Sequence, residues 1–147
     1  MARPKPRPYK PKFPKKYKGD PTKIVCRSSW ETKYCIWLDH NSSVLEWASE
    51  EVVIPYKSPI DNKWHRYFTD FFVKVQTKDG GTEIWIVEIK PMKETRPPRV
   101  RKRRTKGYIN EVKTWGVNEA KWIAAQKWCE ERKYKFIILT EKELGIK

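Results

Sequence analysis

The sequence has few residues of the kinds that build zinc sites, disulfide frameworks and membrane spans. Its 147 residues include only three cysteines, Cys26, Cys35 and Cys129, and two histidines, His40 and His65. No two cysteines have Cys-x-x-Cys spacing, so we expect reduced thiols, as in a cytosolic protein, rather than zinc ligands or disulfides. No apolar run is long enough to cross a bilayer, and no apolar segment of a signal peptide follows the charged N-terminus. We therefore expect no membrane association.

Acidic residues are scarce relative to basic ones. The chain has 33 lysines and arginines against 18 aspartates and glutamates, which gives a formal net charge of +15. Such an excess favours a polyanion, and so a nucleic acid, as the partner. The length fits one domain with a modest core around one sheet.

One basic segment lies at the N-terminus. Residues 1–19 contain no acidic residue and are rich in proline, which excludes a helix or a core strand. We predict a basic arm over residues 1–19 and a single domain over residues 20–147. If the arm lies along nucleic acid, its cations neutralise phosphates, among them Lys15, Lys16 and Lys18. A solubilising tail and an arm packed on its own domain are the alternatives.

A second basic segment follows residue 90. It is too long for a hairpin loop, and its prolines keep the first half extended. We interpret it as a loop that grips DNA, because arginine forms paired hydrogen bonds with phosphate; a solvated run of charges is the alternative. Its candidate contacts are Lys93, Arg96, Arg99, Arg101, Lys102, Arg103, Arg104 and Lys106.

A β-hairpin over residues 65–90 is the clearest structural signal. Residues 65–75 and 82–90 are rich in aromatic and β-branched side chains, and the Asp-Gly-Gly sequence between them favours a tight turn. Because side chains alternate faces along a strand, Glu88 and Lys90 share one face. Charges at the end of such a hydrophobic strand need a partner, which makes them a candidate site.

The chemistry that suits this site is metal-dependent phosphodiester hydrolysis. Asp70 and Glu88 supply the carboxylate oxygens that Mg²⁺ prefers, and the backbone carbonyl of Ile89 adds another. Lys90 is placed to orient a water or to stabilise charge on an attacked phosphate. Arg66 has the same strand parity as Asp70 and is a candidate phosphate contact. From spacing alone, an ordinary salt bridge between Glu88 and Lys90 is the commoner meaning of this pattern.

The rest of the chain supplies the other elements of an α/β fold. We predict helices over residues 28–39 (with Ser28 as N-cap) and 107–132 (divided near Gly116), and strands over residues 50–56 and 134–140. A strand–helix–strand connection favours a parallel last strand. The order α-β-β-β-α-β then gives a mixed central sheet flanked by helices. Lys121 and Gln126, on the second helix, are further candidates for substrate contact.

The motifs resemble those of the PD-(D/E)XK nuclease superfamily. Phe68-Thr69-Asp70 followed by Glu88-Ile89-Lys90 is similar to its signature, with threonine in place of the usual proline. Over residues 17–144 the chain looks like the head-completion nucleases of T-even-type bacteriophages and, more distantly, the TnsA-like transposon endonucleases. The segments that carry this wider resemblance are Arg27-Ser28-Ser29-Trp30-Glu31, Trp47-Ala48-Ser49-Glu50-Glu51, Ile54-Pro55-Tyr56 and His65-Arg66-Tyr67-Phe68-Thr69-Asp70-Phe71.

The resemblance implies a restriction-endonuclease-like core and a DNA endonuclease that uses Mg²⁺, with Mn²⁺ as a substitute. It implies Asp70 and Glu88 as metal ligands, Lys90 as the catalytic lysine and Glu31 as a third acid that completes the metal site. From the residues alone, Glu31 is equally the capping-box partner of Ser28.

The resemblance also implies partners and a setting. These are double-stranded DNA and phage portal or neck proteins, in the host cytoplasm during phage assembly and in the virion head or neck. Two alternative functions share the fold. One is a non-catalytic virion protein that binds DNA and stabilises the filled head. The other is a junction or transposon-end endonuclease. Neither the oligomeric state nor the number of metal ions follows from the sequence.

Overall fold

The computed structural model describes residues 5–146; residues 1–4 of the predicted arm and residue 147 of the predicted domain lie outside the described residues. The strands and helices are β1 (Arg7–Pro8), β2 (Val25–Cys26), α1 (Ser29–His40), β3 (Val44–Ser49), β4 (Val53–Lys57), β5 (Trp64–Phe68), β6 (Phe71–Gln76), β7 (Thr82–Ile89), α2 (Lys106–Arg132), β8 (Lys135–Leu139) and α3 (Glu141–Leu144). Short 3₁₀ helices occupy Pro14–Lys16, Pro21–Lys23 and Met92–Thr95.

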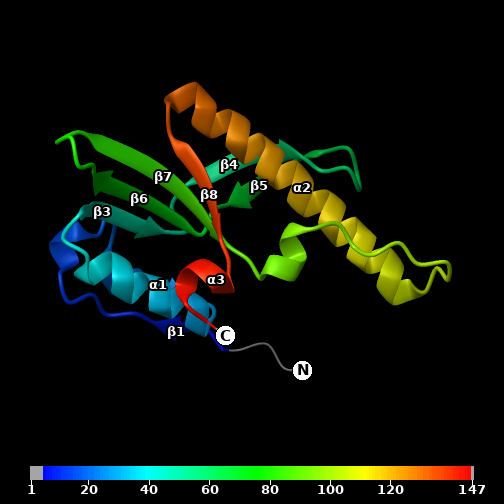
Figure 1. Cartoon of the computed structure of the whole chain (residues 1–147), viewed down its shortest axis with the longest axis horizontal. Helices are drawn as coiled ribbons and strands as arrows, with labels where there is room; N and C mark the ends of the chain where they lie inside the picture. Colours follow the sequence, from blue (N-terminus) through cyan, green and yellow to red (C-terminus); the bar gives the residue numbers. More distant parts are fainter. Residues whose placement is uncertain (1–4, 147) are drawn as a thin grey trace.

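The central sheet has the strand order β3-β6-β7-β8 (Figure 1). Strands β3, β6 and β7 are antiparallel neighbours, and β8 runs parallel to β7. Helix α1 packs on one face, where the ring of Tyr34 meets that of Phe71 edge-to-face with centroids 5.0 Å apart. Helix α2 covers the face that carries Glu88. The mixed sheet and the parallel last strand are as predicted.

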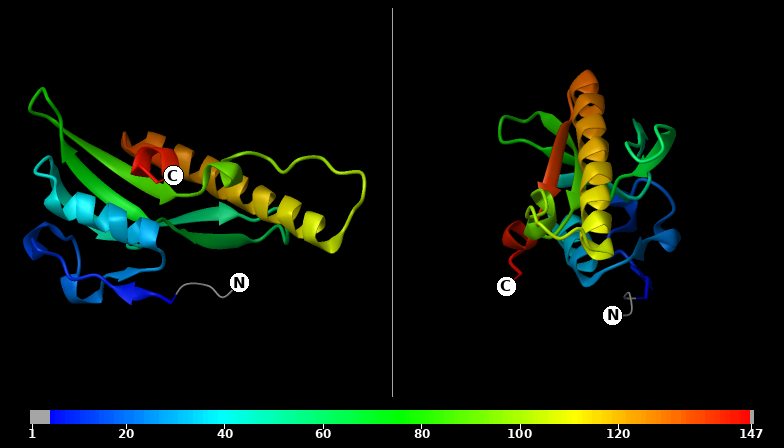
Figure 2. Two further views of the ribbon diagram at one scale, coloured as in Figure 1. Left: turned by 60° about the horizontal axis from the view of Figure 1, so that its bottom comes forward. Right: turned by 90° about the vertical axis from the view of Figure 1, so that its right-hand side faces the viewer.

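The predicted strand over residues 65–75 is wrong, because the chain bends at Thr69. The first part, β5, pairs only with β4 in a separate two-stranded ribbon, whereas β6 joins the central sheet. The bend is fixed by Val52, whose carbonyl accepts hydrogen bonds from both the backbone N–H (3.1 Å) and the hydroxyl (3.0 Å) of Thr69. The predicted strand over residues 50–56 correspondingly starts later, at Val53. The β4–β5 hairpin therefore projects beyond the end of the sheet, beside α2 (Figure 2).

Helix α2 runs without a break from Lys106 to Arg132, so the predicted division near Gly116 is wrong. A glycine inside a helix costs only about 1 kcal/mol relative to alanine, and packing on either side offsets that cost. The ring of Pro59, in the loop between β4 and β5, lies beside Gly116.

The described part of the N-terminal arm, residues 5–19, lies along the domain. Strand β1 pairs with β2, and Tyr17 is buried with its ring 4.8 Å from that of Trp47. The buried carboxylate of Asp39, near the end of α1, accepts hydrogen bonds from the backbone N–H groups of Lys12 (2.6 Å) and Phe13 (3.0 Å) and from the hydroxyl of Tyr9 (2.8 Å). The buried Asp39 carboxylate thus anchors the arm to α1 through three hydrogen bonds.

Candidate active site

The antiparallel pairing of β6 and β7 brings the two predicted carboxylates together. Phe71 lies opposite Val87 in the register, so Asp70, immediately before β6, adjoins Glu88, near the end of β7. Both side chains therefore point to the face of the sheet that α2 covers. The bend at Thr69 places Asp70 between β5 and β6 rather than in the middle of a long strand.

Asp70 is partly buried and tied to the strand that carries Glu88. Its Oδ2 accepts a hydrogen bond of 2.8 Å from the backbone N–H of Ile89. Burial, and then the neighbouring charge of Glu88, raise the pKa of Asp70 well above its usual value. The positive charge around Asp70 is therefore too small to offset the cost of ionising this buried carboxyl group beside Glu88.

Glu88 is the more enclosed carboxylate, with only 6% of its surface exposed. Its Oε2 accepts a hydrogen bond from the hydroxyl of Tyr67, and its Oε1 lies 3.9 Å from Nζ of Lys90. Burial raises the pKa of Glu88, while the Tyr67 hydrogen bond and the charges of Lys90 and Lys121 act in the opposite direction. The contact with Lys90 is the salt bridge anticipated from spacing, but it sits beside a second buried acid.

Tyr67 and Lys121 join the cluster of Asp70, Glu88 and Lys90 from outside the central sheet. Tyr67 comes from β5, and Lys121 comes from α2. The Lys121 ammonium lies 5.6 Å from the ring centroid of Tyr67 and 5.8 Å from that of Tyr56. Burial lowers the pKa of Lys121, and the charge of Glu88 partly opposes this. No sequence pattern assigns a role to Tyr67, because only the folded hairpin brings it to Glu88.

Glu31 lies in the first turn of α1, at the side of the site. The Ser28 hydroxyl accepts a hydrogen bond from its N–H (3.2 Å), as predicted for an N-cap. The Glu31 carboxylate, however, accepts from the backbone N–H of Arg27 (2.9 Å) instead of closing a capping box. Burial raises the pKa of Glu31, and the positive charges of Arg27 and Lys90 lower it. Arg27 also forms a 2.7 Å ion pair with Glu50, whose backbone N–H donates to the carbonyl of Asp70 (3.0 Å).

Within residues 5–146, no three side chains among His, Cys, Asp and Glu are close enough to form a ready metal-binding group. The predicted set of Glu31, Asp70 and Glu88 is therefore not preassembled as a three-acid site. Asp70 and Glu88 nonetheless suit a hard cation, since both are oxygen donors whose raised pKa a cation would lower. Mg²⁺ commonly binds through one or two carboxylates and keeps several waters.

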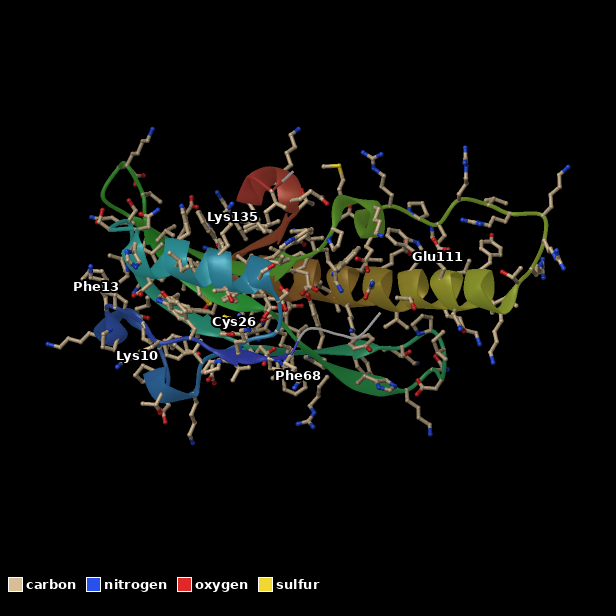
Figure 3. All side chains as sticks on the ribbon, turned by 90° about the horizontal axis from the view of Figure 1, so that it is seen from below. Lys10, Phe13, Cys26, Phe68, Glu111 and Lys135 are labelled. Atoms are coloured by element: carbon tan, nitrogen blue, oxygen red, sulfur yellow. The ribbon has the colours of Figure 1, made fainter. Side chains whose placement is uncertain are left out.

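The residues predicted to contact DNA lie on several elements, and most of them belong to the basic loop before α2. All eight basic residues from Lys93 to Lys106 are exposed, and their loop runs along the N-terminal half of α2 (Figure 3). A cavity of about 440 Å³ lies between this loop and α2, lined by Arg96 and Trp115 among others. Gln126, a further candidate on α2, is exposed and donates to Glu130 (3.0 Å).

The other predicted cations are spread over the surface. Lys15 and Lys18 are exposed, and the Lys18 ammonium lies 4.6 Å from the ring centroid of Phe72. Lys16 donates to three backbone carbonyls at the end of α1, at 2.8–2.9 Å, and its contact with DNA stays a prediction. Arg66 does not share a strand with Asp70 and points away from Tyr67 and Glu88. The predicted parity between Arg66 and Asp70 is wrong, because β5 and β6 are separate strands.

Two comparisons with known proteins identify the family of the chain. Residues 41–141 match the family model described as the TnsA-like endonuclease N-terminal domain. The chain therefore belongs to this endonuclease family, whose domain is restriction-endonuclease-like. It is 44% identical over 144 residues to the head completion nuclease of Enterobacteria phage T4, with 93% of each chain covered.

Membership in an endonuclease family makes the chain a DNA-cleaving enzyme. This confirms the predicted fold class, the family resemblance, the nuclease class and DNA as substrate. No helix in the described part of the chain is both long and apolar enough to cross a membrane.

Proposed function

We propose that this protein is a metal-dependent DNA endonuclease that acts when the head of a tailed bacteriophage is completed. The observation that carries the proposal is the pair of carboxylates, Asp70 and Glu88, enclosed beside Lys90 at one end of the sheet. The similarity to the T4 head completion nuclease supports the biological setting. We propose double-stranded DNA and phage portal or neck proteins as partners, in the infected cytoplasm and in the head or neck of the virion.

The proposed cation is Mg²⁺, with Mn²⁺ as a substitute, held by Asp70, Glu88 and the carbonyl of Ile89, with Glu31 at the side as a third acid. When bound, it supplies a Lewis acid for the scissile phosphate and lowers the pKa of a coordinated water. Asp70 is positioned for this by the Ile89 N–H, and Glu88 by the Tyr67 hydroxyl.

Lys90 is the proposed catalytic lysine. It follows β7 directly, and its backbone N–H donates to the Leu139 carbonyl (2.9 Å), so the chain is fixed where the ammonium emerges. There the ammonium can orient the attacking water or stabilise charge on the phosphate. The exposed cations of the loop then hold the DNA backbone, and the exposed Lys15 and Lys18 of the arm extend that surface. We propose that residues 1–19 and 20–147 act as one unit, because the described arm is packed on the domain.

Cleavage of supercoiled plasmid and linear duplex, with Mg²⁺ or EDTA, tests the proposal. We expect cation-dependent cleavage that Asp70→Asn, Glu88→Gln and Lys90→Ala each reduce by at least about 100-fold. The matched controls are Glu83→Gln, at the opposite end of β7, and Lys78→Ala, in the β6–β7 turn; both should cleave like the wild type. DNA binding without cleavage in any cation would favour the non-catalytic head-stabilising protein instead.

A further inference from the structure

One face of the β4–β5 hairpin is exposed although it carries large apolar side chains. In the pairing of the two strands, Val53 lies opposite Phe68, and Lys57 lies opposite Trp64. Alternate residues such as Tyr67 are buried toward α2, and the residues between them are exposed. This exposed side, called the outer face below, consists of Val53, Pro55, Lys57, Trp64, Arg66 and Phe68. At the far end of the hairpin, Trp64 also borders a hollow that the hairpin shares with Ile123 and other residues of α2.

The outer face combines aromatic rings with positive charge. Trp64 is 71% exposed and Phe68 is 51% exposed. Arg66 lies between them on β5, with its guanidinium 5.5 Å from the centroid of the Phe68 ring. A single exposed ring needs no explanation, but several apolar side chains gathered on one face mark an interaction site. The cations on this face suit phosphate, and its rings suit flat apolar surfaces. The face is therefore suited to a ligand that has both.

The outer face adjoins the carboxylate site along β5, on the opposite side of the strand from Tyr67. Phe68 precedes Asp70 by two residues. Tyr67 lies between Arg66 and Phe68, and its hydroxyl donates a hydrogen bond to Glu88 from the other side of the same strand. In Figure 3, Phe68 lies on the side of the hairpin away from α2, near the point where the hairpin joins the sheet. Within the described residues, the edge of β5 that does not pair with β4 is free. A DNA strand that passes around this edge from the carboxylates therefore meets Phe68 first and then Trp64.

We propose that the outer face binds single-stranded DNA next to the cleavage site, with bases stacked on Trp64 and Phe68 and phosphates bound by Arg66 and Lys57. The inference deepens the proposed endonuclease function and rests on it for the identity of the polymer. Interleaved rings and cations are the chemistry of single-strand binding, because every base has a face that can stack. In a duplex those faces are covered by neighbouring bases.

The basic loop and the outer face thus have different chemistry. The loop carries many cations and suits the phosphates of a duplex. The two rings of the outer face are four residues apart, about 13 Å along an extended strand, which is room for several nucleotides. The enzyme would then prefer DNA in which a duplex meets an unpaired strand at the carboxylates.

The test is the affinity of the full-length protein for three fluorescent DNA probes, measured by anisotropy in EDTA. The probes are a blunt duplex, the same duplex with an unpaired thymine tail, and the thymine oligonucleotide alone. We expect Trp64→Leu and Phe68→Leu each to weaken binding of the tailed and single-stranded probes by about tenfold. Binding of the blunt duplex should stay within about twofold of wild type, since its bases are not available to stack.

Two further variants separate stacking from other effects. Trp64→Phe keeps an aromatic ring and should retain most of the affinity for the tail. Trp37→Leu removes a 45% exposed tryptophan from α1 and should change no affinity. The inference is overturned if Trp64→Leu binds all three probes like the wild type, as a face used by a protein partner would predict. It is also overturned if affinity for all three probes falls equally.

These outcomes are independent of cleavage. Because binding is measured in EDTA, a tail-specific loss would support the outer face even if no cation activated the enzyme. Conversely, normal cleavage of blunt duplex with unchanged tail binding would leave the nuclease proposal intact and remove only this inference.

Discussion

The hydroxyl of Tyr67 holds Glu88 in place, and its effect on ionisation can be measured. The hydrogen bond favours the charged form of Glu88 and so lowers its pKa. We predict that Tyr67→Phe raises the pKa of Glu88, so that the acid side of the pH–activity profile moves to higher pH. Below that pH, kcat/KM should fall by about tenfold, the order expected for a lost hydrogen bond to a charged group.

Recovery of activity at higher pH would distinguish this positioning role from a folding defect. The control is Tyr56→Phe, whose ring also faces Lys121. Its pH profile should match that of the wild type. A Tyr67→Phe profile that is lowered equally at every pH would contradict the assignment.

Ionisation of the buried Asp70 carboxyl group lowers the stability of the folded protein. Its pKa is raised in the folded state, so the folded protein binds a proton there more tightly than the unfolded chain does. Stability associated with Asp70 is therefore present at low pH and is lost as pH rises from the ordinary aspartate range through the raised pKa.

We predict that Asp70→Asn stabilises the protein above that range while abolishing cleavage. A gain of about 1 kcal/mol would raise Tm by roughly 3 °C. Thermal unfolding should show a small difference at about pH 4 and a larger one at about pH 8. Mg²⁺ should raise the Tm of the wild type more than that of Asp70→Asn, because a ligand stabilises only the state that binds it. A lower Tm for the variant at both pH values would contradict this account.

At the scale of elements, two side chains join the arm to α1: Lys16, which donates to backbone carbonyls at the end of the helix, and Asp39. Asp39 is 1% exposed and accepts three hydrogen bonds from the arm. Without the carboxylate, the N–H groups of Lys12 and Phe13 lose their acceptor. We predict that Asp39→Ala lowers the free energy of unfolding by about 3 kcal/mol and frees the arm for cleavage by trypsin.

Urea unfolding and limited proteolysis would measure both effects. Asp61→Ala, which removes an exposed aspartate from the β4–β5 loop, is the control. Its tryptic pattern in the arm should be unchanged. An Asp39→Ala protein with a protected arm would show that β1–β2 pairing and Tyr17 suffice to anchor it.

At the scale of the whole molecule, charge and shape act together. The β4–β5 hairpin and the basic loop project on either side of α2, beyond the end of the sheet where Asp70 and Glu88 lie (Figure 2). The net charge of +15 makes binding to DNA strongly dependent on salt. Cations of the loop should account for a large part of that dependence, because they are exposed and adjacent to one another.

We predict that replacing Arg101, Lys102, Arg103 and Arg104 together by glutamine flattens the plot of log K against log salt for duplex DNA. The slope should fall by about three to four units if each residue neutralises one phosphate. The charge-matched control replaces exposed lysines elsewhere, namely Lys23, Lys33, Lys78 and Lys142. Equal slopes for the two variants would show that net charge, rather than the loop, attracts the DNA.

The sequence by itself determined the features that local patterns encode. Alternating apolar residues, the Asp-Gly-Gly turn and the Ser28 cap predicted β6, β7 and α1, because propensity and hydrogen bonding act within a few residues. The signature residues singled out Asp70, Glu88 and Lys90, and the charge indicated a nucleic acid. The family comparison confirmed the nuclease class, while the roles of the individual residues stay predictions.

Only the tertiary structure decided what surrounds those residues. The bend at Thr69 depends on a carbonyl 17 residues away, and it turned one expected strand into two. That bend gives Glu88 its partner Tyr67 and turns Arg66 outward with Trp64 and Phe68, while the packing of α2 brings Lys121 beside the Tyr67 ring. Each of these contacts joins residues distant in sequence, whose meeting is set by strand register and by helix packing. A pattern along the chain carries no record of such contacts.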